Sequence, residues 1–356
     1  MMDRSRNTAT SMPDELATDA FLARPPGVPV IDVRTPDEFA LGHIPGALNV
    51  PLFSNIERAE IGTAYKQEGR RSAVSLGLRR VGPRLEELAH TLLALADPAD
   101  PCLHIHCWRG GMRSASVAWL METTFGCRVA TLKGGYKSFR RWVLDSFTIP
   151  RTVRFVSGLT GCGKTEILKQ LADLGECTVD LEGLANHKGS AFGQLGEDAQ
   201  PSQAQFENEL ALAWRATAPD RPVWLEDESR MIGKRVLPEA IWDRKQNARF
   251  HVVELPDAER ITHLCKVYAG FPPGKLAACV ETIRQRLGGG RAKTTIEALH
   301  SGDFAAACGI ILSYYDRTYQ TCLAVYPPAN ITRHPFPKLD PHTIAATLIE
   351  STRLSP

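Results

Sequence analysis

The sequence predicts an α/β protein of two domains, and three observations support this fold class. The chain has 356 residues, which is more than one ordinary hydrophobic core holds. Short apolar segments alternate with helical patterns, as in parallel sheets covered by helices. Two glycine-rich segments, HCWRGGMRS (106–114) and GLTGCGKT (158–165), each follow an apolar strand and begin a helix.

The first predicted domain is an α/β domain that spans residues 14–147. Its expected elements are strands at 28–34, 103–107 and 128–132, and helices at 36–42, 83–97, 112–124 and 137–147. The helix at 83–97 is indicated by the helical spacing of its leucines and alanines. After residue 52 the sequence is charged and lacks a clear period, so we expect an irregular insertion that continues to about Gly82.

The second predicted domain spans residues 151–356 and is expected to be a P-loop NTPase-like α/β domain with a helical C-terminal extension. Its expected elements are strands at 153–158, 178–183, 222–229 and 248–255, and a helix at 164–175. From Asp257 onward the pattern is mostly helical.

Composition limits the class of protein without identifying a partner. Hydrophobic residues make up 43% and charged residues 23% of the chain, as in soluble globular proteins. A net charge of +2 neither demands nor excludes nucleic acid. The nine cysteines form no C-x-x-C pair, so we expect thiols and no metal site. Without a signal peptide or an apolar run of ~20 residues, we predict a cytoplasmic protein with no membrane contact.

The loop around Cys107 is predicted to hold a nucleophile. Backbone N–H groups and the positive end of the following helix favour a thiolate at its start. Arg113 provides a planar fork for an oxyanion, and Arg109 lies in the same loop. These residues describe a cysteine that accepts a group from a tetrahedral anion. The alternative is a buried cysteine beside a turn.

The second loop matches G-x-x-x-x-G-K-[ST] between a strand and a helix, the context that a phosphate loop requires. Its predicted diphosphate-binding residues are Gly158, Thr160, Gly161, Cys162, Gly163, Lys164 and Thr165. Thr165 is a candidate ligand for Mg²⁺. Glu226, Asp227 and Glu228 follow a later strand and are candidates for holding Mg²⁺ or orienting water. A solvated acidic loop is the alternative for these three residues.

Two further segments resemble rhodanese domains, namely DVRTPDEFALGHIPGALNVP (32–51) and LKGGYKSFRRW (132–142). This resemblance implies that Cys107 carries a chalcogen as a persulfide-type intermediate. Five residues separate Cys107 from Arg113, whereas sulfur-transfer rhodaneses commonly have four. Five is also the spacing of cysteine-dependent phosphatases, so a phosphatase with a nucleotide-binding domain is an alternative.

Five separated motifs resemble the tRNA 2-selenouridine synthases. They are RAEIGTAYKQEG (58–69), HCWRGGMRS, GLTGCGKT, DLEGLANHKGSAFG (180–193) and EDESRMIG (226–233). The resemblance implies conversion of wobble 2-thiouridine to 2-selenouridine in tRNAs for lysine, glutamate and glutamine. A geranyl group from geranyl diphosphate is first placed on sulfur, and selenium from selenophosphate then displaces the alkylated sulfur.

Under this resemblance the P-loop holds the diphosphate, and Cys107, Arg113 and Arg109 handle selenophosphate. We expect no tightly bound cofactor, with Mg²⁺ as a candidate ion and selenophosphate synthetase as a candidate partner. The alternatives are the phosphatase, an ATP-dependent sulfurtransferase, and a nucleotide-gated persulfide carrier. The segment 180–193 has no derivable role beyond an ordered loop near the anion.

Contacts with RNA and with the geranyl chain are predicted from weaker patterns. Candidate phosphate contacts are the pairs Arg70–Arg71, Arg79–Arg80, Arg140–Arg141, Lys234–Arg235 and Arg244–Lys245. Candidate base-stacking residues are Trp108, Tyr65 and Tyr136, and candidate residues for an apolar channel are Trp224, Phe192, Phe206 and Trp214. For each, a solvated face or core packing is the alternative.

Overall fold

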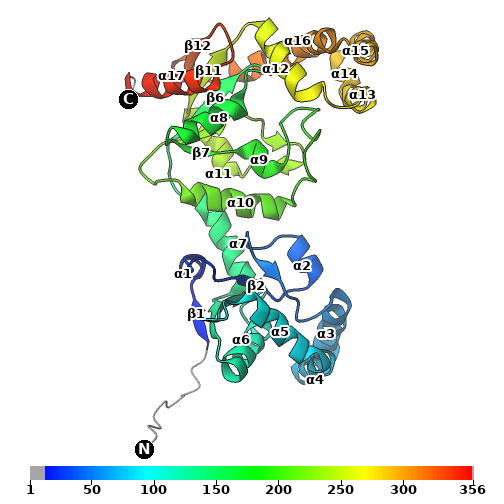
Figure 1. Cartoon of the computed structure of the whole chain (residues 1–356), viewed down its shortest axis with the longest axis vertical. Helices are drawn as coiled ribbons and strands as arrows, with labels where there is room; N and C mark the ends of the chain where they lie inside the picture. The colour runs from blue at the N-terminus through cyan, green and yellow to red at the C-terminus, as the bar shows by residue number, and fades with distance from the viewer. Residues whose placement is uncertain (1–12, 355–356) are drawn as a thin grey trace, which may run out of the picture. The chain divides into compact units, whose positions relative to one another are not determined.

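The computed structural model describes residues 13–354, which form two compact units that divide between Asp145 and Ser146 (Figure 1). Each unit contains one parallel sheet with helices packed against it, so the predicted α/β class is confirmed. The N-terminal segment on which the absence of a signal peptide was argued includes residues 1–12, which lie outside the described residues. Within residues 13–354, no helix combines the length and apolar character that crossing a bilayer requires.

The first unit is built on a five-stranded parallel sheet in the order β1-β5-β4-β2-β3. The strands are β1 (Asp14–Leu16), β2 (Val30–Asp32), β3 (Leu48–Asn49), β4 (Cys102–His106) and β5 (Arg128–Leu132). The helices are α1 (Thr18–Leu22), α2 (Pro36–Ala40), α3 (Asn55–Gln67), α4 (Arg70–Val81), α5 (Leu85–Leu95), α6 (Met112–Phe125) and α7 (Gly135–Ser146), with a 3-10 turn at Gly82–Arg84. Central β4 therefore delivers the cysteine loop at its carboxyl end.

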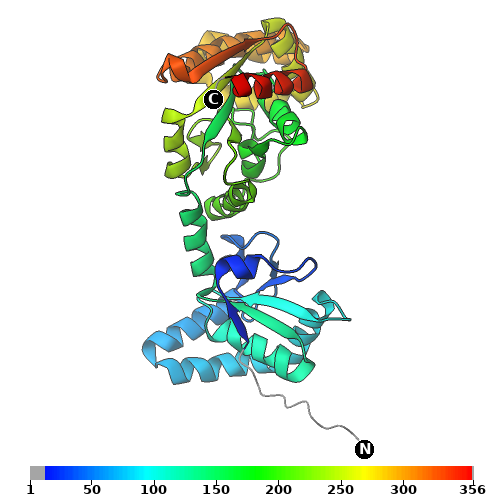
Figure 2. The ribbon, with the colours of Figure 1, turned by 90° about the vertical axis from the view of Figure 1, so that its left-hand side faces the viewer.

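The expected irregular insertion before Gly82 is wrong. The structure shows a helical hairpin, α3 followed by α4, which Figure 2 shows in light blue beside the sheet of its unit. Ser54 caps α3 through a capping box with Glu57. The buried positions of α4 are Ala73, Gly77 and Val81, spaced by four residues, and this small-residue stripe lets the two helices pack closely.

The second unit is built on a parallel sheet in the order β12-β11-β6-β8-β7. Its strands are β6 (Val153–Gly158), β7 (Cys177–Val179), β8 (Val223–Glu226), β11 (Arg249–Glu254) and β12 (Ile331–Pro335), and β9 (Met231–Ile232) pairs with β10 (Arg235–Val236) in a separate ribbon. The helices around the sheet are α8 (Lys164–Asp173), α9 (Leu181–Ala185), α10 (Gln203–Ala216), α11 (Glu239–Trp242), α12 (Asp257–Tyr268) and α17 (Pro341–Leu354), with 3-10 turns at Asp243–Asn247 and Pro328–Asn330.

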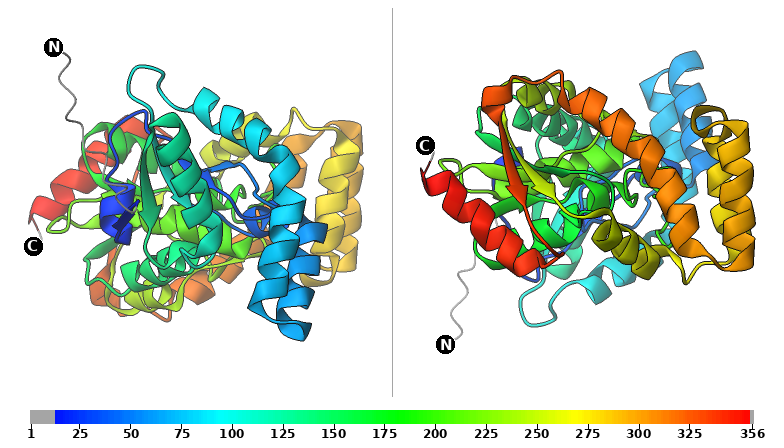
Figure 3. Two further views of the ribbon diagram at one scale, coloured as in Figure 1. Left: turned by 90° about the horizontal axis from the view of Figure 1, so that it is seen from below. Right: turned by 90° about the horizontal axis from the view of Figure 1, so that it is seen from above.

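The helical extension of this unit has an apolar core of its own. It comprises α13 (Pro273–Thr282), α14 (Arg284–Leu287), α15 (Gly289–Ser301) and α16 (Phe304–Leu323). Leu276, Val280, Leu299 and Ala307 are buried together there. Figure 3 shows α16 in orange alongside these helices. The chain then returns to the sheet through β12 and α17, a return that the mostly helical prediction after Asp257 missed.

Candidate functional site

The cysteine loop begins where β4 ends and places its thiol beneath the surface. The Cys107 side chain is only 3% exposed. Its Sγ is hydrogen bonded to Ser114 Oγ at 3.2 Å, and it lies 3.9 Å from the carbonyl oxygen of Gly111. Ser114 belongs to the first turn of α6. The loop thus holds the sulfur at the N-terminal end of a 14-residue helix, whose dipole favours negative charge there.

The predicted closing segment 132–142 shapes this loop. Tyr136 N–H donates to the carbonyl of Cys107 at 2.8 Å, and Lys137 N–H donates to that of Trp108 at 3.0 Å. Gly110 and Gly135 have φ of +62° and +61°. A Cβ on Gly135 would collide with the Cys107 carbonyl, so only glycine allows this approach. Two segments distant in sequence therefore fix the backbone around the thiol.

Arg113 is paired with an acid that the sequence did not single out. Its guanidinium donates to both carboxylate oxygens of Glu38, at 2.7 and 3.3 Å. Burial alone raises the pKa of Glu38, but Arg113 and the Thr35 N–H outweigh it and hold that pKa below its usual value. Arg109 is exposed at the mouth of the loop. The anion fork expected at Arg113 is thus occupied by a carboxylate of its own unit.

The segment 32–34 supports the loop from below. Arg34 is fully buried, donates to both carboxylate oxygens of Asp32, and donates to the Gly42 carbonyl at 2.7 Å. Its guanidinium lies 3.8 Å from the centre of the Tyr136 ring. Tyr136 is therefore buried under Arg34, and the expectation that it stacks on an RNA base is wrong.

The P-loop joins β6 to α8 in a conformation that requires glycine. Gly158, Gly161 and Gly163 have φ of +145°, +86° and +75°. A Cβ on Gly158 would lie 2.6 Å from the Val253 carbonyl oxygen. The buried Arg260 donates to the Thr160 carbonyl at 3.1 Å. It also binds Asp316 of α16, so the loop is tied to the helical extension.

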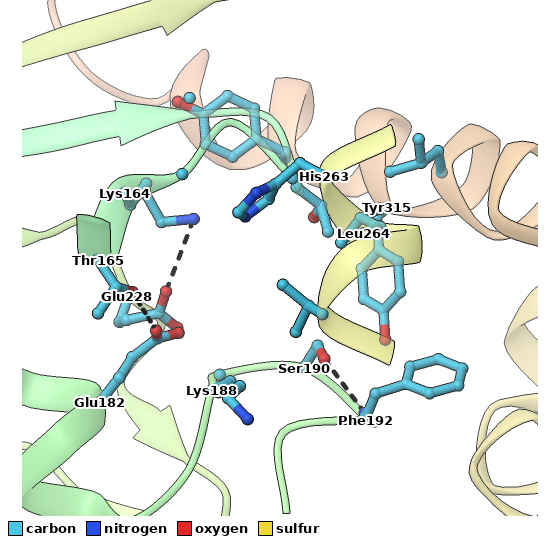
Figure 4. Close-up of a pocket in the computed structure, with 18 of the residues that line it drawn as sticks. Lys164, Thr165, Glu182, Lys188, Ser190, Phe192, Glu228, His263, Leu264 and Tyr315 are labelled. Carbon is cyan, nitrogen blue, oxygen red and sulfur yellow. Dashed lines mark hydrogen bonds and ion pairs between the residues drawn. The ribbon is translucent and has the colours of Figure 1, made fainter. Parts of the chain in front are cut away.

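The cation and hydroxyl of the P-loop face the buried carboxyl group of Glu228 and the half-buried one of Glu182 (Figure 4). Lys164 Nζ lies 3.9 Å from Glu228 Oε1, and Thr165 Oγ1 donates to Glu182 Oε2 at 2.8 Å. Burial raises the pKa of Glu228 to about 8 and also raises the pKa of Glu182. Burial alone lowers the pKa of Lys164, but Glu228 and other neighbours raise it overall, so the ammonium stays charged.

Not every residue expected at this site reaches the cavity. Glu226 is fully buried behind it and accepts a hydrogen bond from Leu181 N–H at 3.0 Å. Cys162 is also fully buried and does not line the cavity. Asp227 and Glu228 do line it, and Asp227 accepts from Lys245 at 2.7 Å and from Ser157. Ser157 in turn is hydrogen bonded to Tyr319 of α16 at 2.6 Å.

The segment 180–193 forms one wall of the cavity. Asp180 caps α9, and Asn186 ends it in the left-handed conformation. Beyond it the chain bends over the two carboxyl groups, where a Cβ on Gly189 would lie 2.9 Å from Glu182 Oε1. Lys188 and Ser190, on either side of Gly189, line the cavity (Figure 4). The structure therefore gives this motif a place beside the P-loop.

The cavity has a volume of about 570 Å³ and two chemically different ends. The P-loop, Glu182 and Glu228 form the polar end. The other end, here called the apolar arm, is lined by Leu264, Val267, Tyr268, Leu276, Leu299, Phe304, Ala307, Cys308, Ile311 and Leu312. One face of α16 lines the cavity from Phe304 to Leu323. At ~1.5 Å rise per residue, Ala307 lies about 18 Å along this helix from Tyr319.

Comparison with known proteins gives one family match in each of the two structural units. Residues 17–141 match the rhodanese-like domain, and residues 151–271 match the AAA domain of tRNA 2-selenouridine synthase. A tRNA 2-selenouridine synthase of Shewanella denitrificans is 40% identical over 266 residues, covering 73% of this chain and 70% of that protein. One of Azotobacter vinelandii is 37% identical over 329 residues, covering 82% and 87%. This chain belongs to the tRNA 2-selenouridine synthase family.

Most of the aromatic residues that were predicted to line an apolar channel lie outside the cavity. Trp224, Phe206 and Trp214 are fully buried and do not line the cavity, whereas Phe192 does. The apolar arm is mostly aliphatic because α12 supplies leucine and valine, and the helical extension supplies leucine, isoleucine and alanine. Sequence reasoning favoured the larger rings and had no signal for which helix faces meet.

The basic pairs also separate into structural and exposed ones. Lys245 is buried and bound to Asp227, and Arg244 donates to the carbonyls of Phe147 and Ile149. This pair is therefore not part of an exposed surface that contacts RNA phosphates, contrary to the prediction, although Lys245 lines the cavity. Arg70 and Arg71, in contrast, are exposed at the start of α4.

Proposed function

We propose that this chain converts 2-thiouridine of tRNA to 2-selenouridine through an S-geranyl-2-thiouridine intermediate. Geranyl diphosphate and selenophosphate are the co-substrates, and the wobble uridine of tRNAs for lysine, glutamate and glutamine is the target. The family supports a role in tRNA selenation. The two-ended cavity of the second unit supports the geranyl step.

The single observation that carries this proposal is the continuity of the P-loop with the apolar arm. A nucleoside triphosphate needs polar partners around its base, whereas a prenyl diphosphate needs an aliphatic surface beyond the phosphates. Here one part of the lining beyond Lys164 and Thr165, the apolar arm, is mostly aliphatic, with Leu264, Leu276 and Leu299 among it. This arrangement favours an isoprenoid diphosphate over the ATP-driven alternative.

In the first step the thiocarbonyl sulfur attacks C1 of geranyl diphosphate. A C–S bond forms, the C–O bond breaks, and diphosphate leaves with the electron pair. Negative charge builds on the leaving diphosphate, where the Lys164 ammonium and the P-loop N–H groups stabilise it. Thr165 and Glu182 would supply oxygen ligands for Mg²⁺, which would balance part of the charge of the diphosphate.

In the second step selenium replaces the alkylated sulfur at C2. Alkylation converts a poor leaving group into a neutral thioether, which departs as geranyl thiol after selenium adds. Cys107, Arg113 and Arg109 handle selenophosphate in the first unit, where the loop N–H groups and the arginines balance its charge. A cytoplasmic selenophosphate synthetase is the proposed source of this co-substrate.

Contact with tRNA is proposed on the exposed side of the first unit. The Arg70 guanidinium lies 3.8 Å from the sulfur of Met112 at the cysteine loop. Arg71 is exposed next to it, and Trp108 is 38% exposed in the loop itself. Arginines can contact phosphates, and an exposed indole can stack on an unpaired anticodon base.

Mass spectrometry of nucleosides tests the proposal. An anticodon stem-loop with 2-thiouridine is incubated with the chain and geranyl diphosphate, then with selenophosphate. We expect S-geranyl-2-thiouridine first and 2-selenouridine second. Formation of 2-selenouridine without geranyl diphosphate, or a requirement for ATP hydrolysis, would favour the sulfurtransferase alternative. Hydrolysis of an aryl phosphate without RNA or selenation would favour the phosphatase.

A further inference from the structure

We infer that Cys107 attacks the phosphorus of selenophosphate and not its selenium. The thiolate takes the phosphoryl group as a cysteinyl phosphate, and selenium is released as selenide for the RNA. This inference rests on the proposed use of selenophosphate. It departs from the persulfide-type role that the rhodanese resemblance implies for Cys107.

The loop has the form of a phosphate cradle. Five residues, 108–112, connect Cys107 with Arg113, and Gly110 in the left-handed conformation turns the chain between them. The thiol lies at the base of this loop, 3% exposed, while Trp108 and Arg109 are exposed above it. A tetrahedral anion held by the loop N–H groups therefore meets the sulfur with its central atom.

Ser114 provides the second observation. Its side chain is 1% exposed, its Oγ lies 3.2 Å from Cys107 Sγ, and its hydroxyl donates to the Gly111 carbonyl at 3.2 Å. A thiolate that must leave phosphorus needs a donor on its sulfur, and the Ser114 hydroxyl can turn from this carbonyl to the sulfur and stabilise the departing negative charge. A persulfide makes no such demand, since its outer selenium is transferred. Ser114 is thus a positioning residue for the hydrolysis of a phosphorylated cysteine.

Electron balance distinguishes the two routes. If the thiolate attacked selenium, the Se–P electron pair would stay on phosphorus, and phosphite, a reduced species, would leave. If the thiolate attacks phosphorus, an S–P bond forms, the Se–P bond breaks, and selenium leaves with the pair. The second route changes no oxidation state and gives a selenium nucleophile. Water then attacks phosphorus, releasing inorganic phosphate and restoring the thiol.

Glu38 fits this sequence of events. The carboxylate holds the Arg113 guanidinium at 2.7 Å when no anion is bound. A bound phosphoryl group presents oxygens that can replace both Glu38 contacts in the same fork geometry. When inorganic phosphate forms and leaves, Glu38 takes Arg113 back. The pair therefore returns the loop to its starting state after each turnover.

Two preparations of selenophosphate, one labelled with ³²P and the other with ⁷⁵Se, test the inference. Selenium and a phosphoryl group differ little in mass, so ³²P and ⁷⁵Se labels are used separately. The full chain is incubated with labelled selenophosphate, geranyl diphosphate and thiouridine stem-loop, and acid-quenched at early times. We expect ³²P without ⁷⁵Se on the peptide that contains Cys107. Label from ⁷⁵Se on Cys107 without ³²P would overturn the inference.

Variants of Ser114 sharpen the result. Loss of a hydrogen bond to the leaving thiolate should slow hydrolysis, so Ser114→Ala should accumulate about tenfold more ³²P on Cys107. Ser114→Thr should restore the wild-type level. Ser116→Ala, on the same helix but exposed, is the matched control and should behave as wild type.

The proposed function and this inference fail separately. If the wild-type chain forms no 2-selenouridine, the proposed function is wrong. If it forms 2-selenouridine while neither the wild type nor Ser114→Ala carries ³²P on Cys107, only the inference is wrong. Melting curves show whether Ser114→Ala is folded, and the Thr variant provides the test if it is not.

Discussion

The cysteine loop and the P-loop hold their cations in different ways, although both begin at the carboxyl end of a parallel strand. Arg113 forms an ion pair with Glu38 at 2.7 Å, and the pKa of Glu38 is lowered. Lys164 lies 3.9 Å from Glu228, whose pKa is raised to about 8. At neutral pH the first acid is charged and competes for its cation, whereas the second is largely neutral.

The difference indicates two kinds of anion binding. At the cysteine loop a ligand must displace a carboxylate, which suits a small anion that enters and leaves during turnover. At the P-loop the Lys164 charge stays available because burial suppresses ionisation of Glu228. There the apolar arm adds binding energy that a small anion cannot use. This contrast agrees with the proposed assignment of selenophosphate to the cysteine loop and of geranyl diphosphate to the P-loop.

The largest expected effect concerns the role of the cysteine loop in selenation. Cys107→Ala should lower selenation by more than about 10³-fold, because no other group in the loop can take its nucleophilic role. Geranylation should continue, so S-geranyl-2-thiouridine should accumulate in nucleoside mass spectra. Cys127→Ala, which removes another buried thiol of the same unit, is the control. Normal selenation by Cys107→Ala would contradict the assignment.

Lys164→Ala tests the role of the P-loop in geranylation. Geranylation should fall about 10²-fold, because the leaving diphosphate loses its main counter-charge. Selenation of an RNA that is already geranylated should be nearly unchanged. Rates of both half-reactions, measured separately, check this. Equal losses in both would show that the two loops do not divide the chemistry.

The apolar arm can be tested by filling it. Ala307 lines the arm and is 1% exposed, so Ala307→Leu should obstruct the far end of a geranyl chain. We expect kcat/KM for geranyl diphosphate to fall about tenfold relative to dimethylallyl diphosphate. Ala305→Leu, exposed on the same helix, is the control. An unchanged ratio of the two kcat/KM values would mean that the geranyl chain does not lie along α16.

Removing the competing acid should sharpen the contrast between the loops. Glu38→Gln keeps an acceptor for the Thr35 N–H but cannot form an ion pair with Arg113. The KM for selenophosphate should fall by up to about fivefold, with kcat changed less. Steady-state selenation of geranylated stem-loop provides the measurement. A rise in KM would indicate that Glu38 orients Arg113 and does not compete with the anion.

The smallest expected effect is a pH dependence at the P-loop. The Glu228 carboxyl is protonated below its pKa of about 8 and becomes charged above it. The carboxylate then repels the diphosphate and competes for Lys164. The affinity for geranyl diphosphate should therefore be level below pH 8 and decline above it. Glu228→Gln should remove this decline, and its persistence in that variant would assign it to another group.

The local sequence pattern was sufficient to predict the two loops, but not the residues that contact them in the fold. The strand, loop and helix at 153–165 could be predicted because the glycines and the apolar run are adjacent in sequence. The pairing of Glu38 with Arg113 spans 75 residues and depends on how α2 packs. No sequence period reports such a contact. The α3–α4 hairpin was missed because its buried stripe consists of alanine and glycine with few large apolar residues.

The burial of Glu226 follows from its place at the end of a central strand. All four residues of β8 are buried because both faces of this parallel sheet are covered, so an acid within the strand lies in the core. The next acids, Asp227 and Glu228, follow the strand and reach the cavity. The aliphatic lining of the apolar arm had no comparable signal in the sequence, since it depends on which faces of α12, α13, α15 and α16 meet.

An exchange of intermediate between two variants tests the division of labour most directly. Stem-loop RNA is treated with Cys107→Ala and geranyl diphosphate, purified, and given to Lys164→Ala with selenophosphate. We predict that the second variant converts the geranylated RNA to 2-selenouridine at close to the wild-type rate, although neither variant alone makes this product from 2-thiouridine. Failure of folded Lys164→Ala to convert the purified intermediate, when the wild type converts it, would contradict the account.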